Sequence, residues 1–352
     1  MRIYNYKDNC EHLLNLEVVS FLTQIHEYNG KQNQQVANNP NAMIPLVDIA
    51  RIQSVKSSNA IEGIYTSEDR IKRLALAKAN PLNNAEEEIA GYRDVLNTID
   101  LHYDNIAIKP GIVLQLHRDL NKYNTFSFSG KYKNSDNVIA EEDENGNRTI
   151  RFKPLEAWAV SDAMTEICSA YNEAITEKHI DPLLVIPMFI LDFLCIHPFN
   201  DGNGRISRLL TLLLLYRCGY LAGKYISIER IIEDTKEQYY DALQKSSFGW
   251  HENENDYLPF VRYMLGVFYS AHKEFDAEAK MISESRLSKP ERVAKVIEEK
   301  LGIITKQEII EKCPGISETT IQRTLGDLLK TNRIRKIGGG RYTSYCWNTE
   351  DR

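Results

Sequence analysis

The feature of this sequence that most constrains its fold is a leucine-rich run that follows directly on a polar turn with two glycines. Residues 195–216 read CIHPFNDGNGRISRLLTLLLLY. The apolar half predicts a buried helix over about 203–218, which ends near Gly219. A rigid, buried helix can hold polar groups at its N-terminus to the tolerance that catalysis requires.

The turn in front of this helix has the composition of an anion-binding site. The glycines of Asp201–Gly204 allow backbone N–H groups to turn toward a bound anion. The N-terminus of the helix adds about half a positive charge. Arg205 and Arg208 are three residues apart, so both side chains lie near one face of the first turn. Together these parts predict a phosphate site with two guanidinium groups.

Two further side chains of the segment suit catalysis at such a site. Asp201, beside a polyphosphate, is suited to hold Mg²⁺, a cation that binds through carboxylate and phosphate oxygens. His197 ends the preceding helix, can reach the same cavity and can accept a proton near neutral pH. Taken singly, each feature has a structural alternative: a histidine packed at a helix end, an aspartate that caps a helix, a Gly-x-Gly turn. We favour the site because all of these features occur together.

Helical periodicity extends over most of the remaining chain before residue 280. The polar residues 29–42 are expected to form a loop, and SSNAIEGI is expected to form a short helix that Ser57 or Ser58 caps and Gly63 ends. Pro187 is expected to remove a hydrogen bond or kink its helix. We predict helices over about 10–28, 44–58, 85–103, 110–121, 154–175, 182–196, 235–246 and 256–278.

One segment before residue 330 has the pattern of a β-hairpin. Tyr132–Ala140 and Arg148–Phe152 are predicted strands, and EEDENGN lies between them. Asn145-Gly146 is a strong signal for a tight turn. We therefore expect an exposed hairpin within residues 131–152.

A basic module is expected after a polar linker at residues 277–291. Residues 285–352 contain 14 Lys and Arg against 9 Asp and Glu, so they carry about +5, and residues 1–284 carry about −11 of the net charge of −6. Helices over 290–300, 305–312 and 317–330, the last capped by Ser317, precede two strand-like pieces that three glycines join. This order of elements is that of a winged helix.

Composition excludes several classes of protein. With 352 residues, 43% hydrophobic and 26% charged, the chain is an ordinary globular protein of two or three domains. Asp8 and Glu11 argue against a secretory leader, and we find no apolar run of membrane-spanning length. Six scattered cysteines without a CxxC pair indicate reduced thiols rather than zinc, which favours a cytoplasmic location.

Residues 197–208, HPFNDGNGRISR, resemble the signature of the Fic family (filamentation induced by cAMP), HPFx[D/E]GNGRxxR, at every defined position. The resemblance implies a mainly α fold: a Fic-type helical bundle with a small hairpin flap. It implies transfer of AMP from ATP to a Tyr, Ser or Thr hydroxyl of a target protein, with pyrophosphate leaving. The expected organisation is an N-terminal helical region at 1–100, a catalytic core at 101–280 and the winged-helix domain at 286–352.

The resemblance also implies a role for each matching residue. ATP and Mg²⁺ are the implied cofactors, the target protein docks on the hairpin at 131–152, and homodimers occur in the family. In this assignment His197 is the general base, Asp201 binds Mg²⁺, Gly202, Asn203 and Gly204 line the anion hole, Arg205 and Arg208 grip the outer phosphates, and Ile139, Tyr239 and Ser247 contact the nucleoside, with Tyr240 the alternative to Tyr239 or a core residue.

A second motif, SSNAIEG at residues 57–63, resembles the inhibitory helix of the family, [S/T]xxxE[G/N]. Ser58 and Glu62 are four residues apart and so share one helical face. The resemblance implies that Glu62 pairs with Arg208 and denies that arginine to the γ-phosphate of ATP. The structural alternative is a capped surface helix.

Other functions stay open from the sequence alone. One is an ATP-sensing, DNA-binding regulator without transferase activity, and another is a transferase that uses a different nucleotide or phosphate ester. The C-terminal module either binds DNA or docks a protein partner. Its outward basic residues would be Arg323 and Lys330 on the recognition helix, and Arg333, Arg335, Lys336 and Arg341 at the wing.

Overall fold

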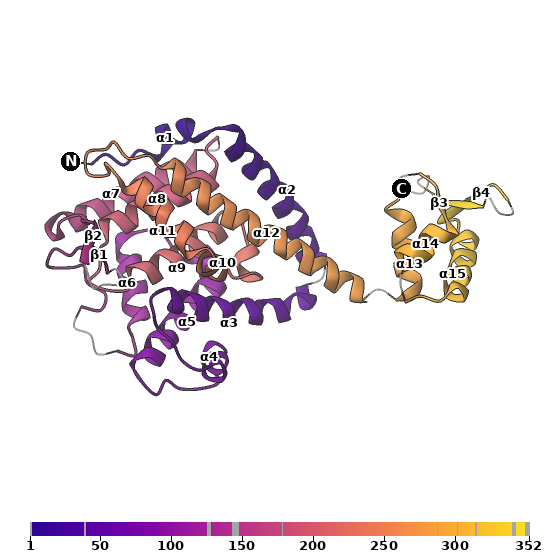
Figure 1. Ribbon diagram of the computed structural model, residues 1–352, viewed down its shortest axis with the longest axis horizontal. Coiled ribbons are helices and arrows are strands. Elements are labelled where there is room, and N and C mark those ends of the chain that lie inside the picture. Colours follow the sequence, from indigo (N-terminus) through magenta and orange to yellow (C-terminus); the bar gives the residue numbers. More distant parts are fainter. Residues whose placement is uncertain are drawn as a thin grey trace. The chain divides into compact units, whose positions relative to one another are not determined.

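The computed structural model describes residues 2–38, 40–124, 128–142, 148–177, 179–286, 288–300, 302–313, 315–339 and 343–348. Within these residues the chain is mainly helical, as the sequence predicts (Figure 1). It divides into two compact units, residues 1–276 and residues 277–352. None of the described helices is both long and apolar enough to cross a bilayer.

Two consecutive helices form the core of the first unit. They are α8 (Pro182–Ile196) and α9 (Asn203–Arg217), and they pack against each other. Every α8 residue after Pro182 is buried, which explains a sequence with almost no polar side chain. Helix α7 (Val160–Thr176) packs on α8, and α5 (Asn84–His102) packs on α9. Figure 1 shows α8 and α9 inside this unit, between α7 on one side and α5 on the other.

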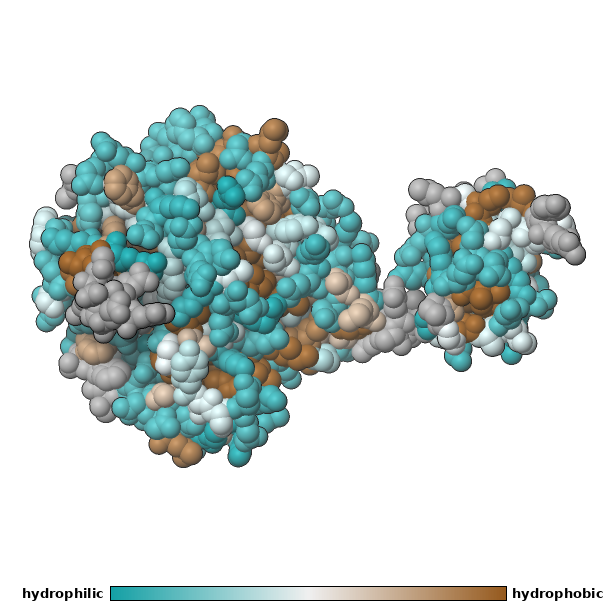
Figure 2. All heavy atoms as spheres, in the orientation of Figure 1, coloured by the Kyte–Doolittle hydropathy of each residue, from teal (hydrophilic) through white to brown (hydrophobic). Residues whose placement is uncertain are grey.

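The expected helices α5, α6, α8 and α9 are confirmed, and α8 continues through Pro187. Two short helices, α4 and α10, were not predicted, and the single helix predicted over 10–28 is two helices, α1 and α2, with a break at residues 14–15. The face of the first unit in Figure 2 is mostly polar, with exposed apolar side chains interspersed. The other helices of this part of the chain are α1 (Tyr6–Leu13), α2 (Leu16–Asn38), α3 (Ile44–Ile61), α4 (Glu68–Ala75), α6 (Pro110–Leu120), α10 (Ile228–Asp234), α11 (Lys236–Ser247) and α12 (Leu258–Arg286).

The prediction of a loop over residues 29–42 was wrong for most of its length, because α2 continues to Asn38. Gln32 is 2% exposed, and its side-chain nitrogen donates to the carbonyl of His272 at 2.5 Å. Its side-chain oxygen lies 2.6 Å from Nδ1 of the same histidine. This pairing with α12 stabilises a helix whose polar composition resembles that of a loop.

The prediction that Ser57 or Ser58 caps a separate helix was also wrong. Both serines are buried inside α3, which is one continuous helix from Ile44 to Ile61. The expected stop at Gly63 is confirmed: its φ is +78°, and its N–H donates to the carbonyl of Ala60 at 3.0 Å. Glu62 therefore lies at the C-terminal end of a long helix whose C-terminal half is largely buried.

The expected hairpin is present, with a shorter first strand than predicted. Strands β1 (Ile139–Glu142) and β2 (Arg148–Phe152) pair antiparallel, and Glu142 lies opposite Arg148. Residues before Ile139 are not a strand, because the backbone N–H of Lys133 donates to the carbonyl of Pro198 at 2.8 Å instead of to a strand partner. The predicted Asn145-Gly146 turn lies outside the described residues.

The polar residues predicted to form a linker from residue 277 instead extend α12 to Arg286. Ala279, within this stretch, is fully buried. The sequence AEAKMISESR is rich in residues with high helix propensity, which explains how a polar segment continues the helix.

The second unit has three main helices and a small antiparallel sheet. The N-terminal caps are Ser288, Thr305 and, as predicted, Ser317, each of which accepts a backbone N–H of the first turn. The strand order is β3-β5-β4, and β3 was not predicted. The predicted wing residue Arg341 lies outside the described residues. The elements are α13 (Lys289–Glu298), β3 (Ile304–Thr305), α14 (Lys306–Lys312), α15 (Glu318–Lys330), β4 (Ile334–Ile337) and β5 (Ser344–Trp347).

Candidate functional site

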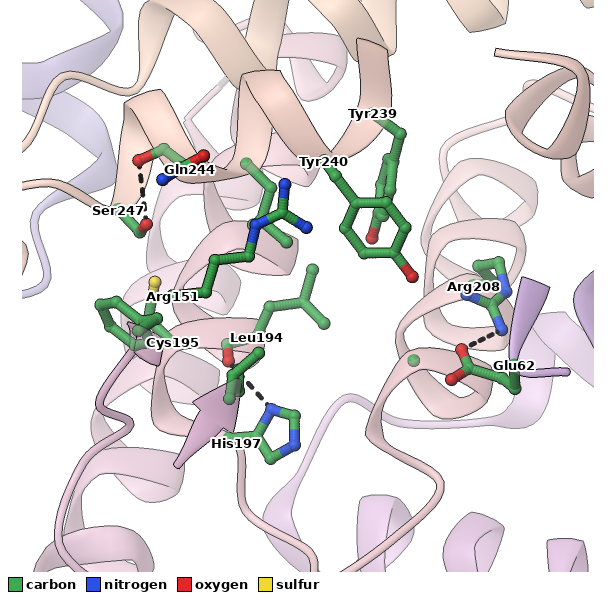
Figure 3. Close-up of a pocket in the computed structure, with 14 residues that line it drawn as sticks. Glu62, Arg151, Leu194, Cys195, His197, Arg208, Tyr239, Tyr240, Gln244 and Ser247 are labelled. Atoms are coloured by element: carbon green, nitrogen blue, oxygen red, sulfur yellow. Dashed lines mark hydrogen bonds and ion pairs between the residues drawn. The ribbon is translucent and has the colours of Figure 1, made fainter. Parts of the chain in front are cut away.

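A cavity lies where the hairpin, the end of α8, the start of α9 and helix α11 meet. It encloses about 830 Å³ of empty space, including its open mouth. Figure 3 shows His197 on one side of this space and Arg208 with Glu62 on another. The lining residues are Glu62, Ile139, Arg151, Phe152, Leu194, Cys195, His197, Gly204, Arg208, Tyr239, Tyr240, Leu243, Gln244 and Ser247.

His197 is the C-terminal cap of α8 and has a left-handed backbone, with φ at 50°. This conformation turns the chain out of the helix and directs the imidazole to the cavity. Nδ1 lies 3.4 Å from the carbonyl oxygen of Leu194. Because a carbonyl can only accept, this contact favours the tautomer with the proton on Nδ1 and a lone pair on Nε2. Burial, with the charge of Lys133, lowers the pKa of His197 to about 4, so the ring is neutral at neutral pH.

The turn between α8 and α9 is held by side chains that point away from the cavity. Gly202 caps α9 with φ at 81°, a conformation that favours glycine. The side chain of Asn203 binds both backbone groups of Phe199, at 2.8 and 2.9 Å. Its amide is thus used to fix the turn, which leaves the backbone N–H groups of Gly202–Gly204 at the helix N-terminus for an anion.

His117, on α6, lies under this turn and was missed in the sequence. Its ring stacks on Phe199 with centroids 3.8 Å apart. Nδ1 accepts the backbone N–H of Gly130 at 3.0 Å, and Nε2 lies 3.2 Å from the carbonyl oxygen of Asp201. Burial lowers the pKa of His117 to about 4. The ring therefore connects the base of the hairpin to the turn.

Arg208 is held by the C-terminal end of α3. Its Nε donates to the Ser58 hydroxyl at 2.8 Å, and its Nη2 donates to the Ser58 carbonyl at 2.8 Å and to Glu62 Oε1 at 2.7 Å. Burial disfavours the charge of Glu62, but the attraction of Arg208 outweighs it and lowers the pKa of this carboxyl. The predicted spacing of Ser58 and Glu62 thus brings both to one guanidinium.

The Glu62 carboxylate also occupies the space beside Gly204. A Cβ at position 204 would lie 2.2 Å from Glu62 Oε1, well inside the contact distance of real atoms. Gly204 is in the first turn of α9, where the helix N-terminus attracts anions. An anionic side chain of the chain itself is therefore present at the predicted phosphate site.

Arg205 and Asp201 lie beside the cavity and do not line it. Arg205 is 1% exposed and forms ion pairs with Glu88 Oε2 at 2.6 Å and with Asp201 Oδ2 at 3.2 Å. The Asp201 side chain is 58% exposed, so it is accessible to a cation. Glu88, on α5, was missed, and no local pattern in the sequence marks it. Among the described residues, no group of three or more His, Cys, Asp or Glu side chains could hold a metal ion by itself.

The far end of the cavity is apolar and aromatic. Ile139, Tyr239 and Ser247, for which nucleoside contacts are predicted, line the cavity, and so does Tyr240. The Arg151 guanidinium lies over the Tyr240 ring, 5.3 Å from its centroid. Sequence reasoning missed Arg151, although the strand that carries it was predicted. A pocket with an apolar and aromatic wall and a few placed polar groups is typical of a small-molecule site.

Acid is expected to destabilise this unit through its buried histidines. Burial lowers the pKa values of His117, His197 and His272 to about 4. In the unfolded chain these histidines have ordinary pKa values near 6.5, so between pH ~4 and pH ~6.5 the unfolded chain binds more protons than the folded one. The free energy of unfolding is therefore at its full value above pH ~6.5 and falls progressively toward pH ~4, by several kcal/mol in all. Thermal unfolding across this range should show a smaller pH dependence for His272→Asn. The same change at His179, which is 73% exposed, should leave the dependence unaltered.

The chain is similar to proteins with a Fic or Fido domain. Residues 107–215 match the Fic/DOC family. A Fido domain-containing protein of Dictyostelium discoideum is 33% identical over 141 residues, which are 40% of this chain and 92% of that protein. Protein adenylyltransferase fic-1 of Caenorhabditis elegans is 32% identical over 114 residues, and protein adenylyltransferase Fic of Aedes aegypti is 45% identical over 69 residues. These matches cover 32% and 20% of this chain, and only 20% and 11% of the two adenylyltransferases.

Solved structures with the same fold include a Fic family protein of Desulfovibrio desulfuricans, with a TM-score of 0.63 and 20% identity over 96% of this chain and 98% of that one. A Fic domain-containing signalling protein of Bacteroides thetaiotaomicron has a TM-score of 0.62 and 21% identity, over 73% of this chain and 97% of that one. At this level of identity the likeness establishes a shared fold.

Proposed function

This chain belongs to the Fic/DOC family, and we propose that it is an autoinhibited protein adenylyltransferase, which transfers AMP from ATP to a Tyr, Ser or Thr hydroxyl of a target protein. The observation that carries the proposal is the convergence of His197 and Arg208 on the N-terminus of α9 within one cavity. A base, an anion site and a guanidinium in one pocket are what phosphoryl or nucleotidyl transfer requires.

In the proposed reaction the target hydroxyl oxygen attacks the α-phosphorus of ATP. A new oxygen–phosphorus bond forms, the bond from the α-phosphorus to the bridging oxygen breaks, and pyrophosphate leaves with the electron pair. The hydroxyl proton passes to Nε2 of His197, which is free to accept it because Nδ1 faces the Leu194 carbonyl. The neutral ring at neutral pH supports this role.

The nucleotide would extend from the turn to the aromatic end of the cavity. Backbone N–H groups of Gly202–Gly204 and the α9 N-terminus would bind the phosphates, and Arg208 would bind the γ-phosphate. The nucleobase would lie against Ile139 and the tyrosines, with Tyr239, Tyr240 and Ser247 at its edges. Arg205, predicted to grip the outer phosphates, does not line the cavity and forms ion pairs with Glu88 and Asp201, so we assign it to the support of Asp201 instead.

Asp201 fits a magnesium ion that is shared with the nucleotide. Mg²⁺ usually binds one or two carboxylates together with substrate phosphates and water, and an exposed single carboxylate beside the phosphate site meets this requirement. When bound there, the ion would neutralise charge on the phosphates. Arg205 keeps the carboxylate oriented through Oδ2, which leaves the other oxygen for the cation.

We propose that Glu62 inhibits the enzyme by competing with the γ-phosphate. Its carboxylate already occupies the space beside Gly204 and the guanidinium of Arg208. ATP that enters the cavity cannot place its terminal phosphate on Arg208 and binds in a pose unfit for in-line attack. Ser58 supports the block because it fixes the same guanidinium from α3.

The target would reach this site along the hairpin. A segment of the target would add to a strand edge of β1 and β2 and present its hydroxyl to His197, a mode in which backbone hydrogen bonds supply affinity. Mass spectrometry of a cell lysate treated with the Glu62→Gly variant and ATP tests the proposal. A mass gain of one AMP on a hydroxyl residue supports it, and competition among nucleotides identifies the donor. A different mass gain would show another donor.

The second unit is proposed to be a winged helix that docks a protein partner. Its order of three helices and a three-stranded sheet supports this fold. Two cations near the recognition helix α15 already have carboxylate partners: Lys306 lies 3.4 Å from Glu318, and Lys330 lies 3.9 Å from Asp327. Local pairing of this kind reduces the charge available for DNA phosphates.

Binding of the full chain to duplex DNA is therefore expected to be weak and without sequence preference, with Kd on the order of 10⁻⁴ to 10⁻⁶ M at physiological salt. Fluorescence anisotropy with several unrelated duplexes and a series of salt concentrations measures it. Tight binding to one sequence, with a steep fall as salt rises, would favour a DNA-binding regulator instead.

A further inference from the structure

A buried lysine at the base of the hairpin has no role in the mechanism above. Lys133 is 3% exposed. Its ammonium lies 2.9 Å from the side-chain oxygen of Asn137 and 3.3 Å from the carbonyl oxygen of Ile196. Both hydrogen-bond acceptors are neutral, and none of the described carboxylates forms an ion pair with the ammonium, although the charges of Asp136 and Glu156 favour its protonated form. Burial lowers the pKa of Lys133 to about 8, so the amine is charged at pH 7 and below.

Lys133 binds the backbone on both sides of His197. Its side-chain ammonium donates to the carbonyl of Ile196, the last residue of α8. Its backbone N–H donates to the carbonyl of Pro198 at 2.8 Å. Between these two contacts His197 has a left-handed backbone, an uncommon conformation that persists when its surroundings fix it. A cation at the C-terminal end of α8 also interacts favourably with the helix dipole.

The charge of Lys133 acts on the imidazole as well. Burial lowers the pKa of His197 most, and the charge of Lys133 lowers it next. The negative charges of Glu62, at the end of α3, and Asp201, in the turn, raise this pKa. Arg208 and Arg151 line the same cavity. A bound triphosphate would bring further negative charge and would favour the protonated ring, which cannot accept a proton from a hydroxyl.

We propose that Lys133 is a positioning residue for His197, which fixes the backbone on both sides of the imidazole and supplies the positive charge that keeps the ring neutral beside a polyphosphate. The catalytic meaning of this assignment rests on the proposed adenylyltransferase function. The arrangement itself is a property of the folded chain, so it can be tested without any turnover.

Two variants separate charge from hydrogen bonding, both made with Glu62→Gly as the common background. Lys133→Gln retains a donor for the Ile196 carbonyl and loses the charge, whereas Lys133→Arg retains both. The protonation of His197 is followed by NMR of nitrogen-15-labelled imidazoles, and its signals are assigned by their loss in His197→Asn. Lys133→Gln is expected to raise the pKa of His197 by about one unit, and Lys133→Arg is expected to leave it within a few tenths.

The pH dependence of AMP transfer gives a second readout. Loss of the charge should move the acidic limb of the rate profile to higher pH, by about the shift seen in the NMR titration. A purely structural role would lower the rate equally at all pH values, and that result, or an unchanged His197 titration in folded Lys133→Gln, overturns the proposal. If Lys133→Gln does not fold, Lys133→Met, which is neutral and of similar length, replaces it with the same expectation.

The two hypotheses fail in different ways. If no variant transfers AMP but the His197 titration shifts in Lys133→Gln alone, the adenylyltransferase function is wrong and the relation between Lys133 and His197 stands. If transfer occurs while both Lys133 variants titrate and react like the background protein, the function stands and the role of Lys133 is refuted.

Discussion

Replacement of Glu62 by glycine is expected to raise the rate of AMP transfer by about 10²- to 10³-fold. The carboxylate lies 2.7 Å from Arg208 and occupies the space beside Gly204, so its removal frees the guanidinium and the helix N-terminus for phosphate. A correctly placed charged donor is worth about 3–4 kcal/mol to a transition state with developing negative charge, which corresponds to that range of rates. Incorporation of label from α-labelled ATP in the presence of Mg²⁺, on added proteins or on the chain itself, measures the change.

The matched control for this variant is Glu68→Gly. Glu68 is an exposed carboxylate at the start of α4 that forms an ion pair with Lys56, outside the cavity. Its loss should leave the rate unchanged. In the Glu62→Gly background, Arg208→Ala should remove most of the gain, because the guanidinium is the group that the glutamate withholds. A folded Glu62→Gly variant that incorporates no label would contradict both the inhibition and the proposed reaction.

Replacement of His197 by asparagine in the Glu62→Gly background is expected to lower the rate of transfer by about 10²- to 10⁴-fold, the usual contribution of a general base. Asparagine cannot accept the proton of the target hydroxyl at neutral pH. ATP affinity should change little, since the phosphates would bind to the α9 N-terminus and Arg208. Single-turnover labelling and calorimetric titration with a non-hydrolysable ATP analogue measure the two quantities.

A matched control uses another histidine of the same unit. His179→Asn alters an exposed side chain away from the cavity and should have no effect on either quantity. If His197→Asn transfers AMP at the rate of its background, the base is another group. If it loses ATP affinity to the same extent as rate, His197 acts in nucleotide binding instead.

The elements that sequence predicted well have strong local signals. Helix α8 begins at a proline after the Asp181 cap, and α9 contains a leucine-rich run and ends near Gly219. The short helices α4 and α10 were missed although Ser67 and Ser227 cap them, because seven or eight residues give little periodicity to detect. Helix α2 replaces most of the loop expected at 29–42 and is stabilised by a contact between Gln32 and His272. These residues are 240 positions apart in the sequence, so the contact leaves no local trace.

In the candidate site, too, some residues could be predicted from local sequence and others could not. Residues of the signature are contiguous, so their meeting at one helix end follows from the sequence itself. Other elements support these residues: His117 contacts the turn, Glu88 pairs with Arg205, and Lys133 binds the backbone next to His197. These contacts depend on how α5, α6 and the base of the hairpin pack. Such partners become visible only when the tertiary structure is known, since a buried histidine or lysine has no distinctive neighbours in the chain.

The position of Glu62 at the tip of α3 has a consequence for how inhibition responds to nucleotide. In the proposed inhibition, the carboxylate would compete with the γ-phosphate as an anion tethered to the same chain. Its effective concentration would be set by the rigidity of α3 and would not change with protein dilution. A rise in ATP alone would then be a weak activator, because ATP can enter the cavity while Glu62 stays on Arg208. A partner that loosens the last turn of α3 would lower that effective concentration directly, and it would switch the enzyme without touching the reacting groups.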